Sequence, residues 1–487
     1  MHPTKKKQEM YRTFLLLFVC MAMPLTLDAH THSSPSHKRA YAGEKCWMYR
    51  LILGDKSGGK YSLQQPQHYL SHKALERRKR QGIAIDSTDL PVSHEYLQQI
   101  RTTGARIKGT SRWHNSVLIE TSDTTLCQAL HDLPFVVSCT KVWQSPDSVM
   151  EGHTKRSVRT DFNPWDSIPS SYYASSLEQI ASVGGIDIHK KGYNGRGITI
   201  AVLDEGFENV NRIPAFKYTR IKGKRSFVAA PIEKGYNESD HGTKVFSVMA
   251  ANAPHVYVGC ATAATYWLLQ CEDPRTEQQV EEDYWTFAAE FADSAGVDII
   301  NSSLGYNEFD FHYADHQLHE LNGTSSFISR SASMLYRKGI ALVCSAGNNG
   351  MGPWKKISFP ADALECITVG AVTTTLKSAP FSSVGPTQDG RVKPDVMAIG
   401  SPAYLISGRG SLVQDMGTSF AAPLVCGMMA CLWQALPHLT ALQLMQLVRR
   451  CGNNVEHANN VYGYGIPDFT QALEQANRFY SPSVSSH

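Results

Sequence analysis

The sequence lacks several features that would mark a membrane, zinc-binding or nucleic-acid-binding protein. After its first thirty residues it has no run of about 18 apolar residues, so we expect no membrane span in the rest of the chain. Its 11 cysteines include no C-x-x-C pair, so no zinc site is predicted. The formal net charge of +3 over 487 residues is too small to indicate nucleic acid as a partner. No internal repeat is present, which argues against a repeat architecture.

The first 29 residues have the composition of an export signal. The apolar run TFLLLFVCMAMPLTL follows four basic residues, Lys5, Lys6, Lys7 and Arg12. The run is shorter than a membrane-spanning helix requires. We therefore predict a signal peptide cleaved near Ala29 and an exported protein, either extracellular or periplasmic. The segment LFVC matches a lipoprotein signal poorly, because a valine stands where a small residue is expected before the cysteine.

The cysteines do not identify the compartment. Cys426 and Cys431 lie five positions apart on one predicted helix, so they face different sides and are not expected to pair. Most of the other cysteines are expected to behave as small buried apolar residues.

Residues 46–143 alternate between strand-like and helical segments. CWMYRLIL, ARIKGTSRWHNSVLIETS and FVVSCTKV are strand-like, and the second of these contains a turn near residues 112–115. PQHYLSHKALERRKRQG, VSHEYLQQIRTTG and DTTLCQALHDL have helical spacing. This order predicts a small α+β, ferredoxin-like domain of βαββαβ type with one extra helix. The domain contains no nucleophile–base pair.

From residue 197 the pattern changes. GITIAVLD, VDIINSS, GIALVCSAGN and CITVGAV are apolar and β-branched without alternation, which is typical of strands buried on both faces of a parallel sheet. Helical segments alternate with them, so the fold class predicted here is α/β with a doubly wound, mostly parallel sheet. In such sheets functional side chains gather beyond the carboxyl ends of the strands, which is where Asp204, Ser303 and Asn348 stand.

Polar stretches separate these units. Residues 144–175 are rich in Ser, Pro, Asp and Gly, which is typical of an exposed and cleavable linker. His30, His32 and His37 are candidates for metal binding, but the polar, aperiodic context of residues 30–45 favours a linker. We expect a signal peptide at 1–29, linkers at 30–45 and 144–175, the small domain at 46–143, the α/β domain at 176–475 and a tail at 476–487.

The segment GTSFAAP places Ser419 among small residues at the start of an apolar helix. Pro423 fits the opening turn of a helix, and the free N–H groups there favour a negative charge that develops nearby. Taken alone, the pattern favours a helix-capping serine over a nucleophile.

Three further side chains supply what a reactive serine requires. His241 opens the helical segment HGTKVFSVMAAN, Asp204 ends a buried strand, and Asn348 follows another strand in SAGNNG. An imidazole can take the proton of a serine, a carboxylate can orient the imidazole, and an amide can donate to an oxyanion. Taken alone, His241 also fits a surface histidine, Asp204 fits a metal ligand or a helix cap, and Asn348 fits a turn residue. Together with Ser419 they predict a hydrolase with a serine nucleophile.

These segments resemble a known family. VLDEG, HGTKV, NSSLG, SAGNNG and GTSFAAP occur in the order and context of subtilisin-like serine proteases, and the Asp, His, Ser order is that of this fold. The spacings of 37 and 178 residues between Asp204, His241 and Ser419 are similar as well. The resemblance covers about residues 175–470, and residues 46–143 resemble the inhibitory, chaperone-like propeptide of these enzymes.

The resemblance implies a role for each residue of the constellation. Ser419 would attack the scissile carbonyl, His241 would act as general base and then as general acid, and Asp204 would orient His241. Asn348 and the backbone N–H of Ser419 would form the oxyanion hole. Further residues are implied in substrate binding: Ser303, Leu304 and Gly305 as a segment that pairs with the substrate backbone, and Ser345, Ala346 and Gly347 as a wall of the pocket for the residue before the scissile bond.

Three positions depart from the pattern of the family. Glu205 follows Asp204 where Ser or Thr is usual, so a second carboxylate either perturbs the site or points away from it. Phe420 replaces a common Met after the nucleophile, with little effect expected. The segment AANAPHVYVGCATAATYWLL is short where many relatives carry a calcium-binding loop, so we expect no cofactor, and calcium lacks support from the sequence.

The predicted function is that of a secreted serine endopeptidase, made as a self-processing zymogen, that acts on proteins or peptides as a monomer with its own propeptide as inhibitor. One alternative is a catalytically silent binding protein with the same fold. A second alternative, an α/β-hydrolase esterase, requires an acid and then a histidine after the serine. The candidates for those two roles are poor: Glu456 with His457 next to it in sequence, or Asp468 with His487 at the end of the chain.

Overall fold

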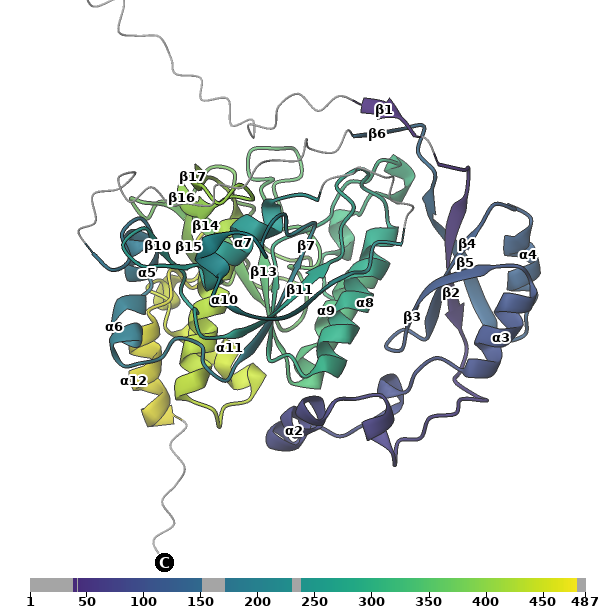
Figure 1. Ribbon diagram of the computed structural model, residues 1–487, viewed down its shortest axis with the longest axis horizontal. Helices are drawn as coiled ribbons and strands as arrows, with labels where there is room; N and C mark the ends of the chain where they lie inside the picture. The colour runs from purple at the N-terminus through teal and green to yellow at the C-terminus, as the bar shows by residue number, and fades with distance from the viewer. Residues whose placement is uncertain (1–37, 42, 151–170, 230–237, 480–487) are drawn as a thin grey trace, which may run out of the picture. The chain divides into compact units, whose positions relative to one another are not determined.

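The computed structural model describes residues 38–41, 43–150, 171–229 and 238–479 (Figure 1). The predicted signal peptide, and most of the linkers predicted at 30–45 and 144–175, lie outside these residues. Residues 46–150 form the N-terminal domain, and residues 171–479 contain the C-terminal domain.

The N-terminal domain is a four-stranded antiparallel sheet with helices packed on it. The strand order is β3-β4-β2-β5, and the core beneath α3 and α4 includes Leu51, Ile100, Ile119 and Leu130. This arrangement confirms the predicted α+β domain. The element bounds are β2 (Trp47–Leu53), α2 (His72–Gln81), α3 (His94–Thr102), β3 (Arg106–Ser111), β4 (Ser116–Thr121), α4 (Leu126–His131), β5 (Val136–Gln144) and β6 (Ser148–Met150).

The extra helix of this domain is α2. It starts after Ser71, whose side chain accepts a hydrogen bond from the N–H of Ala74, and it ends at Gly82, which has a left-handed φ of 68°. The helix is therefore shorter than the helical spacing of residues 66–82 suggested. It packs against α8 (Val280–Ala295) of the C-terminal domain.

The C-terminal domain is built on a seven-stranded parallel sheet, as the sequence predicted. The strand order is β15-β14-β13-β12-β7-β11-β8, and every neighbouring pair is parallel. The strands are β7 (Thr199–Asp204), β8 (Arg220–Ser226), β11 (Thr265–Gln270), β12 (Ile299–Ser302), β13 (Ala341–Ser345), β14 (Ile367–Thr373) and β15 (Val396–Ser401).

Helices cover both faces of this sheet (Figure 1). Alternate residues of β7 enter two different cores: Ile200 and Val202 face the α7 and α10 side, whereas Ala201 and Leu203 face the α8 and α9 side. Burial on both faces explains why polar and apolar residues do not alternate along the strands. The helices are α5 (Leu177–Ala181), α6 (Gly185–Lys190), α7 (His241–Ala250), α8, α9 (Phe327–Met334), α10 (Thr418–Ala435), α11 (Ala441–Arg450) and α12 (Phe469–Phe479).

Short elements complete the described chain. Two hairpins are formed by β9 (Asn252–Ala253) with β10 (Tyr257–Val258) and by β16 (Ala403–Ile406) with β17 (Leu412–Asp415). The other short elements are β1 (Lys38–Ala40) and the 3-10 turns η1 (Pro66–His68), η2 (Ser87–Asp89), η4 (Pro214–Phe216), η5 (His312–Ala314), η6 (Leu318–Glu320), η7 (Tyr336–Lys338) and η8 (Val455–His457).

The helix α10 occupies the centre of the C-terminal domain. Among the described helices it alone has the length and apolar composition of a membrane span, yet 83% of its residues are buried inside the fold. Its contacts with α7, β13, β14 and β15 are those of a central core helix.

The described cysteines are mostly buried thiols. Cys426 and Cys431 are both free, in agreement with the prediction that they would not pair. Cys127 and Cys139 of the N-terminal domain are disulfide-bonded. The other free cysteines are Cys46, Cys260, Cys271, Cys344, Cys366 and Cys451, and all are buried.

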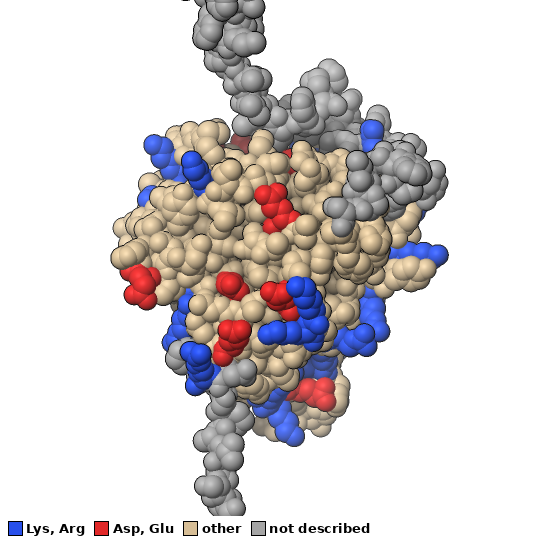
Figure 2. All heavy atoms as spheres, turned by 90° about the vertical axis from the view of Figure 1, so that its left-hand side faces the viewer, with Lys and Arg blue, Asp and Glu red and all other residues tan. Residues whose placement is uncertain are grey.

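Charges of both signs are interspersed on the face of the molecule formed by α5, α6 and α12. Figure 2 shows acidic and basic side chains side by side in the lower half of this face, and a largely uncharged middle. The residues drawn on this face form no continuous basic surface of the kind that follows a phosphate backbone.

Buried ion pairs join the two domains. Asp293 of α8 is fully buried and accepts from Arg78 at 2.9 Å and from Arg112 at 2.6 Å, with Arg77 as a third partner. Burial alone would raise the pKa of Asp293, but the three guanidinium groups lower it to about 2. Arg50 makes a second junction, because it pairs with the buried Asp283 at 2.6 Å.

We predict that Asp293→Ala strongly destabilises the full chain. The substitution leaves three buried arginines without their shared partner, and breaking a buried pair typically costs about 3–5 kcal/mol. The measurement is unfolding in denaturant, monitored by tryptophan fluorescence. Both variants carry Ser419→Ala, which keeps the two domains in one chain. Asp187→Ala is the matched control, because the partner of Asp187 is the exposed Lys190. Equal denaturant concentrations at the unfolding midpoint of the two variants would contradict the prediction.

Candidate active site

Asp204 and His241 meet at the carboxyl end of the central sheet. Asp204 is the last residue of β7, His241 is the first residue of α7, and Oδ1 of Asp204 lies 2.7 Å from Nδ1 of His241. Asp204 is fully buried, whereas 29% of the His241 side chain is exposed. A carboxylate oxygen accepts in this contact, so Nδ1 of His241 is the donor, and Nε2 is the nitrogen that can act as a base when the ring is neutral.

Ser419 lies in the first turn of α10, and the following residue, Phe420, contacts His241. The rings of His241 and Phe420 are 5.7 Å apart, and α7 packs against α10. The hydroxyl of Ser419 donates to the carbonyl of Ser303 at 3.0 Å, and the hydroxyl of Ser303 donates to the carbonyl of Ser419 at 2.9 Å. These two bonds fix the start of α10 against the end of β12.

The Asn348 side chain has a defined orientation. Its Oδ1 accepts from the backbone N–H and from the hydroxyl of Thr418, each at 3.0 Å. A backbone N–H can only donate, so the oxygen of the amide must face Thr418. The amide Nδ2 is thereby left as a donor beside Gly417, where a Cβ would lie 3.6 Å from it.

The segment Ser303–Gly305 continues from the end of β12. Ser303 and Leu304 are buried and Gly305 is exposed. Among the described residues, none forms a hydrogen bond with the backbone of Leu304 or Gly305. The next residue, Tyr306, is fixed by two backbone bonds to Phe359 of 2.8 and 2.9 Å. The segment is therefore held at both ends and has backbone groups available to pair with an extended chain.

Ser345, Ala346 and Gly347 extend from β13 toward Asn348. Ala346 is held by backbone bonds to Val369 and Ser358, and the N–H of Gly347 donates to the Thr418 hydroxyl at 3.1 Å. Gly347 has a φ of +100°, and a Cβ there would lie 2.5 Å from the Ser358 hydroxyl. Only glycine fits this position, and the small residues keep the backbone close to Asn348.

Glu205 faces the site and does not point away from it. Its carboxylate accepts from the Ser239 hydroxyl, which in turn accepts from the backbone N–H of His241 at 3.1 Å. Burial lowers the pKa of His241, but the charge and hydrogen bond of Asp204, together with the charges of Glu205 and Glu272, raise the pKa to about 10.

Two residues near the site do not emerge from the sequence pattern. Thr418 holds both Asn348 and Gly347, yet in the sequence it stands only as part of a small-residue segment between Gly417 and Ser419. Glu272 lies two residues beyond β11, and its ionised form raises the pKa of His241, although burial and the nearby carboxylates raise the pKa of Glu272 itself. Its position after the carboxyl end of an apolar strand, TYWLLQ, is the signal that could have found it.

The segment predicted to be short at a calcium-binding loop forms β9, β10 and β11. The described part of the chain contains no group of three or more His, Cys, Asp or Glu side chains placed to hold a metal ion.

Comparison with known proteins identifies the family. Residues 195–465, more than half of the chain, match the profile described as "Subtilase family". The chain belongs to the subtilase family. Residues 48–158 match a second profile, "Peptidase S8 propeptide domain, Bacteroidota". The C-terminal domain of this subtilase therefore has the fold of a serine peptidase family, and the N-terminal domain matches the propeptide of such peptidases.

The curated relatives of this subtilase are peptidases of low sequence identity to it. Subtilisin NAT of Bacillus subtilis subsp. natto is 27% identical over 303 residues, which cover 62% of this chain and 71% of the relative. Subtilisin DY of Bacillus licheniformis is 28% identical, over 59% of this chain and 94% of the relative. The subtilisin-like protease PopC of Myxococcus xanthus is 28% identical, over 53% of this chain and 56% of the relative.

We predict that activity of this subtilase rises as the pH becomes alkaline. The base must be neutral to take a proton, and the carboxylates around His241 raise its pKa, so the fraction of neutral His241 grows toward high pH. Glu205→Gln removes one of these charges and should move the acid limb of kcat/KM to lower pH.

The measurement is kcat/KM against pH with a short chromogenic peptide, and Glu474→Gln on the exposed face of α12 is the control. An acid limb that stays in place in Glu205→Gln would show that the charge of Glu205 does not act on His241.

Proposed function

We propose that the protein is an exported serine endopeptidase that acts through Asp204, His241 and Ser419 and is made as a self-processing zymogen. The observation that supports this most is the 2.7 Å bond between buried Asp204 and His241, at the sheet edge where Ser419 bonds to Ser303 beyond β12. These are the three groups that nucleophilic hydrolysis requires, in the order of the subtilase fold.

In the proposed reaction Ser419 attacks the carbonyl carbon of the scissile bond. The Ser419 hydroxyl first exchanges its acceptor, the carbonyl of Ser303, for Nε2 of His241. The proton then passes to Nε2 as the Oγ–C bond forms, and His241 returns it to the leaving amine as the peptide bond breaks. Water repeats the sequence on the acyl-enzyme and releases the carboxylic acid. Asp204 keeps Nδ1 protonated and stabilises the imidazolium.

The oxyanion is assigned to Asn348 and to the backbone N–H of Ser419. Thr418 holds the Asn348 amide in the orientation that presents Nδ2. A donor fixed before the reaction begins stabilises the developing negative charge without reorganisation, which is where most of the rate enhancement of such sites arises.

Substrate is proposed to bind as an extended strand along Ser303, Leu304 and Gly305. The backbone groups of Leu304 and Gly305 are available for this pairing, and Ser345, Ala346 and Gly347 form a wall made of small residues next to Asn348. Small residues leave room for a bulky apolar side chain before the scissile bond. The substrate class proposed is therefore proteins or peptides, bound by a monomer without a cofactor.

The propeptide is proposed to inhibit the enzyme until cleavage within residues 147–175 releases it. The buried ion pairs of Asp293 and Asp283 with propeptide arginines support a tightly held complex. The charged and apolar segments of the first 29 residues support export, to the periplasm or the cell exterior.

We predict that maturation depends on Ser419. Expressed from residue 30 onward, the wild type should lose its propeptide by cleavage within 147–175, whereas Ser419→Ala should keep its full mass, because the mutant has no nucleophile. Intact-mass spectrometry distinguishes the two.

Identical trimming of both proteins would mean only that the linker is exposed, and would count against self-processing. Absence of both processing and fluorophosphonate labelling at Ser419 would favour a catalytically silent binding protein.

We further predict that Asn348→Ala lowers kcat by about 10²–10³-fold with little change in KM, because it removes a donor used mainly in the transition state. Steady-state kinetics of the matured enzyme provide the measurement. Labelling of Ser419 by a fluorophosphonate and an unchanged melting temperature are the controls for correct folding. A change confined to KM would assign Asn348 to substrate binding.

A further inference from the structure

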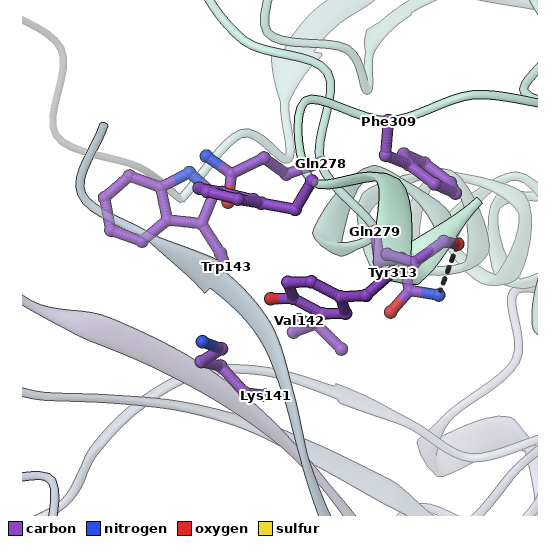
Figure 3. A pocket seen from close by; sticks show the side chains of 9 residues that line it. Lys141, Val142, Trp143, Gln278, Gln279, Phe309 and Tyr313 are labelled. Atoms are coloured by element: carbon purple, nitrogen blue, oxygen red, sulfur yellow. Dashed lines mark hydrogen bonds between the residues drawn. The ribbon is translucent and has the colours of Figure 1, made fainter. Parts of the chain in front are cut away.

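The last long strand of the propeptide, β5, ends in a pocket of the peptidase domain. Figure 3 shows Trp143 of β5 next to Gln278, with Phe309 and Tyr313 on the opposite side. Gln278 lies just before α8, and the two aromatic residues lie in the loop that follows the substrate-pairing segment at 303–305. The cavity that remains between these groups is about 10 Å³, so the propeptide fills the pocket almost completely.

Gln278 binds the backbone of the propeptide through both ends of its amide. The N–H of Gln144 donates to Oε1 of Gln278 at 3.0 Å, and Nε2 of Gln278 donates to the carbonyl of Gln144 at 3.1 Å. A neighbouring β-strand would offer the backbone of Gln144 the same pair of one donor and one acceptor. This contact therefore recognises an extended backbone and is indifferent to the side chain at the bound position.

The side chain before this position fills an apolar part of the pocket. Trp143 is only 3% exposed and belongs to the apolar cluster that contains Val280, Tyr284 and Phe309 of the peptidase domain. Two residues earlier, the ammonium of Lys141 lies 5.5 Å from the ring centroid of Tyr313. The pocket thus takes an aromatic side chain with an extended backbone on each side of it.

The pocket is anchored on the loop that carries the substrate-pairing segment. The N–H of Asp310 donates to the carbonyl of Glu277 at 2.8 Å, and the N–H of His316 donates to the carbonyl of Asn307 at 3.1 Å. These bonds belong to the peptidase domain and do not involve the propeptide. When the propeptide leaves, Gln278 and the apolar residues around it lose their partner, and an apolar recess of this kind favours a new occupant.

We propose that in the matured enzyme this pocket docks an extended segment of a protein substrate, with an aromatic side chain in the position of Trp143 and the following backbone bound by Gln278. Trp143 precedes the processing linker, so the docked segment lies on the amino-terminal side of the bond to be cleaved. The inference rests on the proposed peptidase function, and it adds a determinant of substrate choice outside the catalytic groups.

The test compares two substrates that share one cleavage sequence. The short substrate is a fluorogenic peptide, and the long substrate carries residues 140–147, TKVWQSPD, joined to the amino end of the same peptide by a flexible Gly/Ser linker. We expect KM of the long substrate to be about tenfold lower, with an equal kcat, because two hydrogen bonds and a buried ring are added. A Trp143→Ala version of the extension should lose most of this advantage.

Variants of the matured enzyme locate the effect. Gln278→Ala should raise KM for the long substrate to that of the short one and leave the short substrate unchanged, whereas the exposed control Gln471→Ala in α12 should change neither. If Gln278→Ala does not mature, the free peptide TKVWQSPD is used on the wild type, where it should inhibit cleavage of the long substrate only.

Equal KM values for the two substrates on the wild type, or equal inhibition of both by the free peptide, would overturn the docking proposal. Failure of the wild type to cleave either substrate would instead overturn the proposed peptidase function.

Discussion

All seven strands of the central sheet run in one direction, and this constraint brings the groups of the site to a single edge. Parallel strands end together, so Asp204 at the end of β7, Ser303 beyond β12 and Asn348 beyond β13 converge although they are distant in sequence. The first turn of α10 also lies at this edge, because Ser419 and Ser303 exchange two hydrogen bonds there. The packing of the core thus brings the first turn of α10, which contains Ser419 and Phe420, to the same edge as His241.

The junction between the two domains depends on burying charge in matched pairs. The helix α8 presents Asp283, Glu290 and Asp293 to the propeptide, and all three are nearly or fully buried in the zymogen. Each is met by propeptide donors, among them Arg50 and Arg112. A buried carboxylate without a partner is costly, so the peptidase face and the propeptide are complementary only as a pair. The contacts that hold the propeptide on the peptidase domain are thus the same contacts that favour folding of the two domains together.

Much of the fold was predictable because the buried strands have a simple signature. The runs GITIAVLD, VDIINSS, GIALVCSAGN and CITVGAV became β7, β12, β13 and β14, and the α/β class and the small α+β domain were confirmed. The catalytic roles of the site residues stay predictions. The sequence did not reveal that Thr418 orients Asn348, that Glu205 acts on His241 or that Gln278 binds Gln144. Each of these is a contact between distant segments, and neither spacing nor composition encodes it.

In their proposed roles, the pocket at Gln278 and the wall at Ser345–Gly347 would select substrates in different ways. Gln278 recognises an extended backbone, so most of the specificity it offers lies in conformation and in one aromatic side chain. The backbone at Gly347 packs closely against Ser358 and Thr418, so in its proposed role the wall at Ser345–Gly347 would discriminate by size next to the scissile bond. Two backbone hydrogen bonds join Tyr306, which follows the segment at 303–305, to Phe359. Under the two proposals an extended chain would contact both regions, whereas a folded chain would not present its backbone to either.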